Sequence, residues 1–255
     1  MELIAAQEAV AVVLAAGKSR RMASDKAKVL ISLNGRPMIT YVLSALTEAD
    51  VSRKVLVIGH QADLVRESLK DNHNLEYAFQ ASQLGTGHAV GCCRDLLRDH
   101  EGPIVILAGD QPLIQAASIK HLVKTFQENS YACILGSATL DDPSGLGRIV
   151  RDENQNFLRI VEQKDADEKE QSIQEINVSC YVFHPRLLWE ALDKISPDNN
   201  QKEWYLTDCI EVLIQQGHRV EALNVISPVE ALGINTQEQL LEVERQIQNQ
   251  CHSSK

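Results

Sequence analysis

The stretch VAVVLAAGKSRRM, residues 10–22, begins as an unbroken apolar run and ends in a glycine followed by three cations. A strand that is apolar at every position is typical of a parallel sheet covered on both faces. Ligands bind at the carboxyl ends of such strands, where Gly17 would let the backbone approach a bound molecule closely. Free backbone N–H groups at this turn, together with the cations that come after it, are well suited to bind a phosphate chain. The alternative is a plain strand–loop junction with surface cations, since the stretch fits neither a Walker A loop nor a G-x-G-x-x-G motif.

Apolar runs alternate with helix-length amphipathic stretches along the first half of the chain. The runs recur at 54–59, 75–80 and 103–110, and the amphipathic stretches lie at 36–50, 61–72, 85–100 and 114–129. Pro37 fits the first turn of the first of these helices. The alternation predicts an α/β fold built on a doubly wound, mostly parallel, twisted sheet.

The pattern changes after residue 130. We expect strands at 131–140, 177–185 and 218–225, two short strands around a polar turn at 147–163, a charged solvated segment at 164–171, and helices at 186–192, 204–217 and 235–250. Gly217 is placed to end the helix before it. These elements predict a small β-rich insertion into the α/β fold.

Composition and charge exclude several classes of protein. The chain has 255 residues, 44% of them hydrophobic, and a formal net charge of -10, which argues against a general nucleic-acid binder. No stretch approaches the length of a membrane span, and the apolar N-terminus lacks the basic region of a signal peptide. The six cysteines form no C-x-x-C pair and have no zinc-ligand spacing, so we expect reduced thiols and a cytoplasmic protein with no membrane partner.

Seven motifs, in this order, resemble those of a known family. They are LAAGKSRRM (14–22), KAKVLISLNGRPMI (26–39), QASQLGTGHAV (80–90), AGDQPLI (108–114), DDPSGLGRIV (141–150), EINVSCYVF (175–183) and ALGINTQEQL (231–240). Over residues 10–244 the chain resembles the uridyltransferase (pyrophosphorylase) domain of the bacterial bifunctional N-acetylglucosamine-1-phosphate uridyltransferases. The resemblance implies a Rossmann-like fold of the nucleotide-diphospho-sugar transferase type. It also implies one nucleotidyltransferase domain over 1–255, with a nucleotide-binding half (1–130), a sugar-binding half (131–234) and a C-terminal helix and tail (235–255).

The resemblance implies a role for individual residues. Leu14, Ala15, Ala16, Gly17, Gln80, Gln83, Gly85 and Thr86 would bind the nucleotide, Arg21 and Lys28 its phosphates, Asp110 and Asn235 a Mg²⁺ ion, and Gly147, Glu162 and Asn177 the sugar. Arg21, Lys28 and Asp110 would be the catalytic groups. Five residues depart from the family pattern: Ser19, Arg20, Ala27, Ala108 and Leu146.

The local sequence around the two expected metal ligands can be interpreted in more than one way. Asp110 ends an apolar run, where its carboxylate could hold a hard cation at the ligand edge of the sheet. It could instead be a helix N-cap, a position that aspartate favours. Asn235 could likewise cap the last helix, with Gln239 not placed to complete a capping box with it.

The expected sugar ligands have local alternatives as well. A sugar needs neutral donors and acceptors and a carboxylate for its hydroxyl groups, which Asn177 and Glu162 supply. Glu162 could instead be an exposed partner of Lys164, and Asn177 could be a turn residue. His88 lies in the first turn of an expected helix and is interpreted as structural.

The activity that the resemblance implies is Mg²⁺-dependent formation of UDP-N-acetylglucosamine and pyrophosphate from UTP and N-acetylglucosamine 1-phosphate. The sugar phosphate would attack the α-phosphate in line, without a covalent protein intermediate, and cations would meet the charge on the transferred group. Two alternatives stay open. One is a nucleotidyltransferase for another sugar 1-phosphate or NTP, and the other is a catalytically silent nucleotide-sugar-binding module.

The sequence contains no hexapeptide repeat, the unit from which the bifunctional family builds its β-helical acetyltransferase domain. We therefore expect uridyltransfer without acetyltransfer. Because the β-helix also builds the family's trimer, we expect a monomer or an oligomer that is not a trimer.

Overall fold

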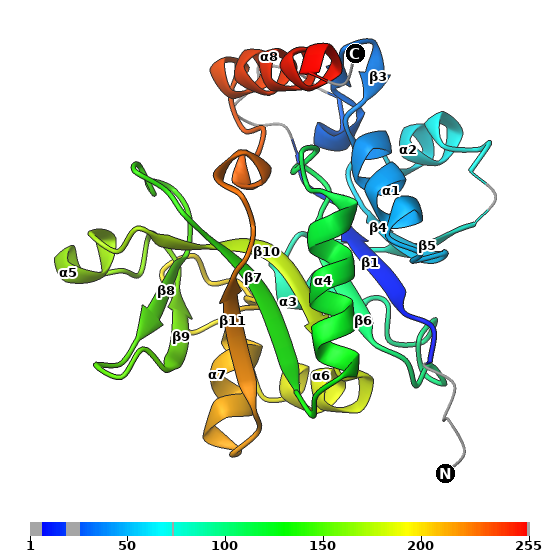
Figure 1. Cartoon of the computed structure of the whole chain (residues 1–255). Coiled ribbons are helices and arrows are strands. Elements are labelled where there is room, and N and C mark those ends of the chain that lie inside the picture. Colours follow the sequence, from blue (N-terminus) through cyan, green and yellow to red (C-terminus); the bar gives the residue numbers. More distant parts are fainter. Residues whose placement is uncertain (1–6, 19–25, 73, 254–255) are drawn as a thin grey trace.

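The computed structural model describes residues 7–18, 26–72 and 74–253. Within them, nine strands form one sheet in the order β11-β7-β10-β6-β1-β4-β5, with β8 beside β10 and β9 beside β8 (Figure 1). The strands are β1 (Val10–Leu14), β4 (Arg53–Ile58), β5 (Leu75–Phe79), β6 (Ile104–Ala108), β7 (Cys133–Thr139), β8 (Arg148–Arg151), β9 (Phe157–Val161), β10 (Glu175–Phe183) and β11 (Val220–Asn224). The pairs β1–β4, β1–β6, β4–β5 and β7–β11 are parallel, whereas β10 runs antiparallel to β6 and β7. The predicted α/β fold with a mostly parallel sheet is confirmed.

Helices cover both faces of the sheet. They are α1 (Ile39–Glu48), α2 (Ala62–Ser68), α3 (Thr86–Gly91), α4 (Ala116–Gln127), α5 (Glu168–Gln171), α6 (Pro185–Leu192), α7 (Asp208–Gln215) and α8 (Gln237–Ser253), with short 3₁₀ turns η1 (Lys28–Leu30) and η2 (Pro228–Ala231). One core cluster joins the sheet to α1, α2 and α4, and a second joins it to α3, α6 and α7.

Strand β1 explains why the opening run is apolar throughout. Ala11 and Val13 belong to the first core cluster, and Val10 and Val12 belong to the second. Side chains alternate between the faces of a strand, so a strand covered on both faces must be apolar at each position. All four residues are fully buried.

The segment before α1 corrects one prediction. Pro37 does not lie in the first turn of a helix but pairs with Ser32 in a hairpin of β2 (Ser32–Leu33) and β3 (Arg36–Pro37). Asn34 and Gly35 form its two-residue turn with φ of 48° and 80°, a conformation that the Asn-Gly pair favours. The helix therefore starts only at Ile39.

A third apolar cluster connects this hairpin to the C-terminal helix. It joins Leu33 and Met38 to Ile234 and to Leu240 and Val243 of α8. The cluster consequently ties the segment that carries Lys28 to the segment that carries Asn235, although the two lie far apart in the sequence.

Several boundaries differ from expectation. The helix expected at 85–100 ends as α3 at Gly91, and the helix expected at 204–217 begins only at Asp208. Gly217, with φ of 79°, follows the end of α7 as predicted. The charged segment 164–171 contains α5, whose Asp167 and Glu170 form a capping box. The predicted pair of short strands at 147–163 is confirmed as the antiparallel β8–β9 hairpin.

Candidate active site

A cavity of about 450 Å³ opens beside the carboxyl ends of β1 and β6. Twelve of the predicted site residues line it: Leu14, Ala15, Ala16, Gly17, Lys28, Gln80, Gln83, Gly85, Thr86, Asp110, Glu162 and Asn235. Arg21 lies outside the described residues, as do Ser19 and Arg20. Gly147 and Asn177 do not line the cavity. The structure thus gathers residues from the whole length of the sequence around one space, at the sheet edge where open α/β sheets bind ligands.

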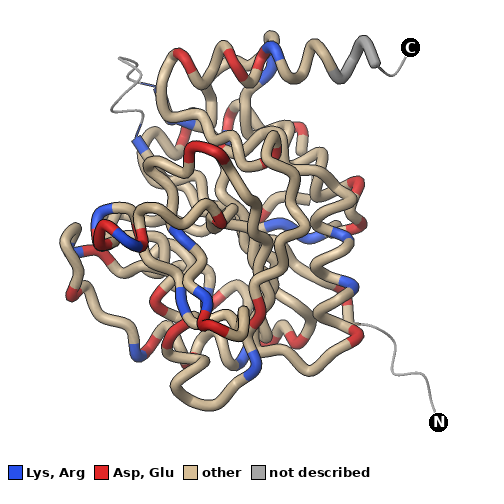
Figure 2. Tube along the Cα trace, turned by 60° about the vertical axis from the view of Figure 1, so that its left-hand side comes forward, with Lys and Arg blue, Asp and Glu red and all other residues tan. Residues whose placement is uncertain are grey.

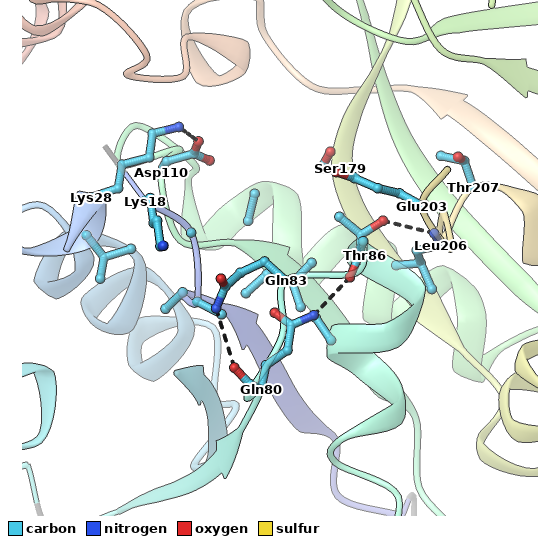
Figure 3. A pocket seen from close by; sticks show the side chains of 18 of the residues that line it. Lys18, Lys28, Gln80, Gln83, Thr86, Asp110, Ser179, Glu203, Leu206 and Thr207 are labelled. Atoms are coloured by element: carbon cyan, nitrogen blue, oxygen red, sulfur yellow. Dashed lines mark hydrogen bonds and ion pairs between the residues drawn. The ribbon is translucent and has the colours of Figure 1, made fainter. Parts of the chain in front are cut away.

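Two polar oxygens and an ammonium group meet at one end of this cavity. Figure 3 shows the ion pair of Lys28 and Asp110 there. The Nζ atom of Lys28 forms an ion pair with the Asp110 carboxylate and lies 2.7 Å from Oδ1 of Asn235. The turn after β6 holds Asp110 in place, because Gly109 N donates to Leu14 O at 2.9 Å and Ile234 N donates to Asp110 O at 3.0 Å. Asp110 and Asn235 therefore converge on the position of a cation.

Neither of the two residues caps a helix. Helix α4 begins six residues after Asp110, with Gln115 at its N-cap, so the N-cap interpretation of Asp110 is wrong. At the start of α8 the reciprocal bonds join Thr236 and Gln239: Gln239 N donates to Thr236 Oγ1, and Thr236 N donates to Gln239 Oε1. This is a capping box one residue later than Asn235, which leaves the Asn235 carboxamide directed at Lys28.

The loop that follows β5 is tied to a distant strap, residues 203–207. Trp204 N donates to Leu84 O, and Gly87 N donates to Trp204 O, each at 2.8 Å. Leu206 N donates to Thr86 Oγ1 at 2.9 Å. A Cβ atom at Gly85, where φ is 114°, would lie 2.3 Å from the Trp204 carbonyl oxygen, so this close approach requires glycine. The strap also carries Glu203, Leu206 and Thr207 into the cavity wall.

The same wall carries the carboxylate of Glu162. Thr207 Oγ1 donates to Glu162 Oε1 at 3.2 Å, and burial raises the pKa of Glu162 above its usual value. Lys164 donates instead to Gln201, so the interpretation of Glu162 as its exposed partner is wrong. A Cβ atom at Gly147 would lie 3.5 Å from Glu162 Oε2. Gly147 therefore leaves room beside the carboxylate without lining the cavity itself.

Asn177 shapes the same wall from behind. It is a buried residue of β10, so the interpretation as a turn residue is wrong. Its Nδ2 donates to the Tyr181 hydroxyl at 2.6 Å, and its Oδ1 accepts from Ser179 N at 3.1 Å. The register of β10 shifts between Asn177 and Tyr181, and Ser179 has φ of 55°. This bulge directs Ser179 and Tyr181 toward the cavity.

Sequence reasoning did not single out several residues of the cavity wall. They are Lys18, Val29, Ala89, Ser179, Tyr181, Glu203, Leu206 and Thr207. Ser179 and Tyr181 reach the cavity through a strand bulge that apolar periodicity does not reveal. Leu206 and Thr207 lie in a stretch that looked like the start of a helix. Lys18 is one of the cations of the stretch AGKSRR, and the sequence gives no sign that distinguishes it from the arginines beside it as a phosphate-binding group.

Charge is distributed over the molecule without segregation into halves. Figure 2 shows Lys and Arg interspersed with Asp and Glu along the described trace. Within the described ranges, no three or more His, Cys, Asp or Glu side chains form a group that could hold a metal ion. The described helices also include none that is long and apolar enough to cross a membrane.

Asp208, next to Thr207, gives a pH-dependent prediction. Burial, with Glu162, Glu211 and Asp165 nearby, raises its pKa from 3.8 to about 6. The unfolded chain then loses this proton at a lower pH than the folded protein, so folding is disfavoured increasingly as the pH rises from about 4 to about 6. Asp208→Asn should remove this penalty and increase the free energy of unfolding at pH 7.5 by about 1–2 kcal/mol, after allowance for solvent screening.

Urea unfolding at pH 4 and pH 7.5 measures this effect. The gain from Asp208→Asn should nearly vanish at pH 4, and the exposed control Asp95→Asn should change little at either pH. An equal gain at both pH values would contradict the assignment of the penalty to the Asp208 charge.

Fold and site together define a class of α/β protein with a ligand cavity at the carboxyl ends of its strands. A glycine turn follows β1, a glycine-containing loop follows β5, and the carboxylate after β6 pairs with Lys28. The model of the MobA-like NTP transferase domain matches residues 11–208. The chain belongs to this family.

Individual curated proteins within the family resemble the chain more specifically. The chain is 42% identical over 240 residues to the Bifunctional protein GlmU of Acetivibrio thermocellus. The aligned region covers 94% of this chain and 52% of the relative. It is 44% identical over 239 residues to the protein of the same name from Heliobacterium modesticaldum, with coverage of 94% and 52%. The chain thus spans about half the length of the curated relatives it matches.

A solved structure supports the fold. A Bacillus anthracis protein described as a glucose-1-phosphate thymidylyltransferase, crystallised in complex with a sucrose, superposes with a TM-score of 0.73. The match covers 93% of this chain and 94% of the other, at 18% sequence identity. At this identity the likeness concerns the fold alone.

Proposed function

We propose that this chain transfers a uridylyl group from UTP to N-acetylglucosamine 1-phosphate and releases pyrophosphate. One observation carries the proposal: the same cavity is lined by the loops after β1 and β5, by the cluster of Lys28, Asp110 and Asn235, and by the wall that carries Glu162 and Thr207. Loops with exposed backbone suit a nucleotide, and a carboxylate with hydroxyl neighbours suits a sugar. The relatives named GlmU support this choice among the reactions open to the family.

We infer that Asp110 and Asn235 hold a Mg²⁺ ion during the reaction. Their carboxylate and carboxamide oxygens are donors that Mg²⁺ prefers, and both already approach a single cation, the Lys28 ammonium group. Two protein ligands suffice for Mg²⁺ in sites where substrate phosphates and water supply the rest. When bound, the ion would supply Lewis-acid stabilisation of charge on the phosphates.

The chain's own residues would bind and orient the two substrates. Lys18 and Lys28, both in the cavity wall, would neutralise phosphate charge, and Arg21 would add a further cation. Glu162, held by Thr207, would accept hydrogen bonds from sugar hydroxyl groups. Asn177 would act mainly by holding Tyr181 and the bulge at Ser179 in place. In-line transfer between the two bound phosphates requires positioning and no protein nucleophile.

The organisation of the chain follows the same scheme. We propose a nucleotide-binding half at 1–130, a sugar-binding half at 131–234 and a C-terminal segment at 235–255 that supplies Asn235. A cytoplasmic location agrees with the free thiols of Cys92, Cys93, Cys133, Cys180 and Cys209.

A matrix of substrates tests the proposed reaction against its alternatives. Pyrophosphate release should be measured with UTP, TTP, CTP and ATP, each paired with N-acetylglucosamine 1-phosphate, glucosamine 1-phosphate and glucose 1-phosphate. We expect the highest kcat/KM for UTP with N-acetylglucosamine 1-phosphate. A higher value for another pair would replace the proposed substrates, and no release with any pair would favour a binding module.

Glu162→Ala should raise the KM for the sugar phosphate much more than the KM for UTP. The loss of hydrogen bonds to a charged acceptor costs about 1.5–3 kcal/mol, so the KM for the sugar phosphate should rise by about 10- to 100-fold, while the KM for UTP should change less than about twofold. Steady-state kinetics with each substrate varied in turn measures both values. Lys164→Ala, two residues away, is the matched control and should leave both nearly unchanged. Equal increases in the two KM values would mean that Glu162 acts through the fold.

A further inference from the structure

The orientation of one buried side-chain amide is fixed by its neighbours. Gln80 is 3% exposed, and its Nε2 lies 3.1 Å from Gly85 O and 2.9 Å from His88 Nδ1. A backbone carbonyl oxygen only accepts hydrogen bonds, so the amide atom that faces Gly85 must be the nitrogen. Gly85 itself cannot turn away easily, because Trp204 packs directly against it.

His88 takes the second hydrogen of the same amide nitrogen. One hydrogen of Gln80 Nε2 points to Gly85 O, which leaves the other for His88 Nδ1. His88 Nδ1 then accepts, and the ring proton resides on Nε2. The ring is held on α3 against Trp204, with ring centroids 6.5 Å apart. A reversed Gln80 amide would set its oxygen against the Gly85 carbonyl oxygen and would require the His88 ring proton to move to Nδ1.

The consequence is an amide that presents only its oxygen to the cavity. Gln80 lines the cavity, and Nε2 makes both of the side-chain hydrogen bonds that the structure describes for it. Figure 3 shows Gln80 beside Gln83 in the cavity wall, with its nitrogen engaged. An acceptor that cannot exchange places with a donor pairs with a base that carries an imino N–H. Uracil and thymine carry this group at N3, whereas cytosine has an acceptor there.

We propose that His88 is a positioning residue for base selection: it locks the Gln80 amide so that Oε1 admits uracil or thymine and rejects cytosine. The inference rests on the proposed function and assigns to His88 a share in its nucleotide specificity. His88 acts through Gln80 and needs no contact with the nucleotide. A purely structural histidine would instead affect all nucleotides alike.

Two substitutions of His88 separate these roles. His88→Phe keeps a ring against Trp204 but removes the acceptor, whereas His88→Asn can place its Oδ1 near the former Nδ1 position. Cys92→Ala is the control for local packing, because the Cys92 thiol donates to the His88 carbonyl and does not approach Gln80. The dissociation constants for UTP and CTP should be measured by calorimetry, in parallel with kcat/KM for the two nucleotides.

The wild-type protein should favour UTP over CTP, and His88→Phe should reduce this preference by about 5- to 10-fold, the effect of one hydrogen bond worth about 1–1.4 kcal/mol. His88→Asn should restore much of the preference, and Cys92→Ala should retain it. An unchanged preference in His88→Phe, or an asparagine variant no better than the phenylalanine one, would overturn the proposal.

A measurement on the wild-type protein keeps the proposal testable if His88→Phe does not fold. 3-Methyl-UTP lacks the imino N–H, and its dissociation constant should exceed that of UTP by at least about 10-fold. Equal binding of the two would overturn the proposal. If no pyrophosphate is released but UTP is preferred in binding and His88→Phe reduces that preference, the proposed reaction is contradicted and the role of His88 is supported.

Discussion

Replacing Asp110 by asparagine should reduce turnover by about 100-fold or more while the protein remains folded. The substitution removes the negative charge that faces the Lys28 ammonium group and that we expect to hold Mg²⁺. A loss of this size is typical when one preorganised electrostatic group is removed from an active site. The side chain keeps its shape, so the effect would report charge and not packing.

The measurement is kcat at saturating Mg²⁺, UTP and sugar phosphate, with thermal unfolding to verify the fold. Asp50→Asn is the matched control, since Asp50 forms an exposed ion pair with Lys120 and neither residue lines the cavity. Its kcat should equal that of the wild-type protein. Turnover of Asp110→Asn within about threefold of wild type would refute a role of the carboxylate in the reaction.

The second large effect is expected for Gly85→Ala. A side chain there combines an unfavourable φ of 114° with a Cβ only 2.3 Å from the Trp204 carbonyl oxygen. The loop and the strap at 203–207 must then separate, which displaces the Gly85 carbonyl from Gln80 and weakens the bond between Thr86 and Leu206. We expect the free energy of unfolding to fall by about 1–3 kcal/mol and kcat/KM for UTP to fall by about 100-fold or more.

Gly91→Ala provides the control. Gly91 ends α3, and a Cβ there would meet no other atom within 4 Å. Alanine is favoured over glycine in a helix, so this variant should be as stable as the wild type or slightly more stable, with unchanged kinetics. Nearly unchanged UTP binding by Gly85→Ala would contradict the coupling of the loop to the strap.

The fold could be predicted because the patterns that determine its strands and helices lie within short stretches of sequence. The apolar run 10–14 and the alternating pattern after it express the burial of β1 on both faces, and this holds wherever helices cover both sides of a sheet. Proline suits both a helix start and the strand of a hairpin, so Pro37 alone does not distinguish them, and the turn at Asn34 and Gly35 decides for the hairpin.

The site was predictable only in part. Asp110 could be suspected from its place at the end of an apolar run, but its meeting with Lys28 and Asn235 depends on the packing of α8 on the β2–β3 hairpin, which no spacing reveals. The resemblance supplied Asn177, which the structure places behind the wall formed by Tyr181. The bulge that directs Ser179 and Tyr181 toward the cavity interrupts strand periodicity, so the apolar pattern does not reveal it.

The central claim is that this cavity joins a sugar phosphate to a uridine nucleotide, and ³¹P NMR of one reaction tests it most directly. The protein should be incubated with UTP, N-acetylglucosamine 1-phosphate and Mg²⁺, and the phosphorus signals followed with time. We expect the monoester signal to decrease while the two diphosphate resonances of a nucleotide sugar and the signal of pyrophosphate grow in equal molar amounts. A monoester signal that does not decrease in the presence of folded protein, with or without hydrolysis of UTP, would contradict the account.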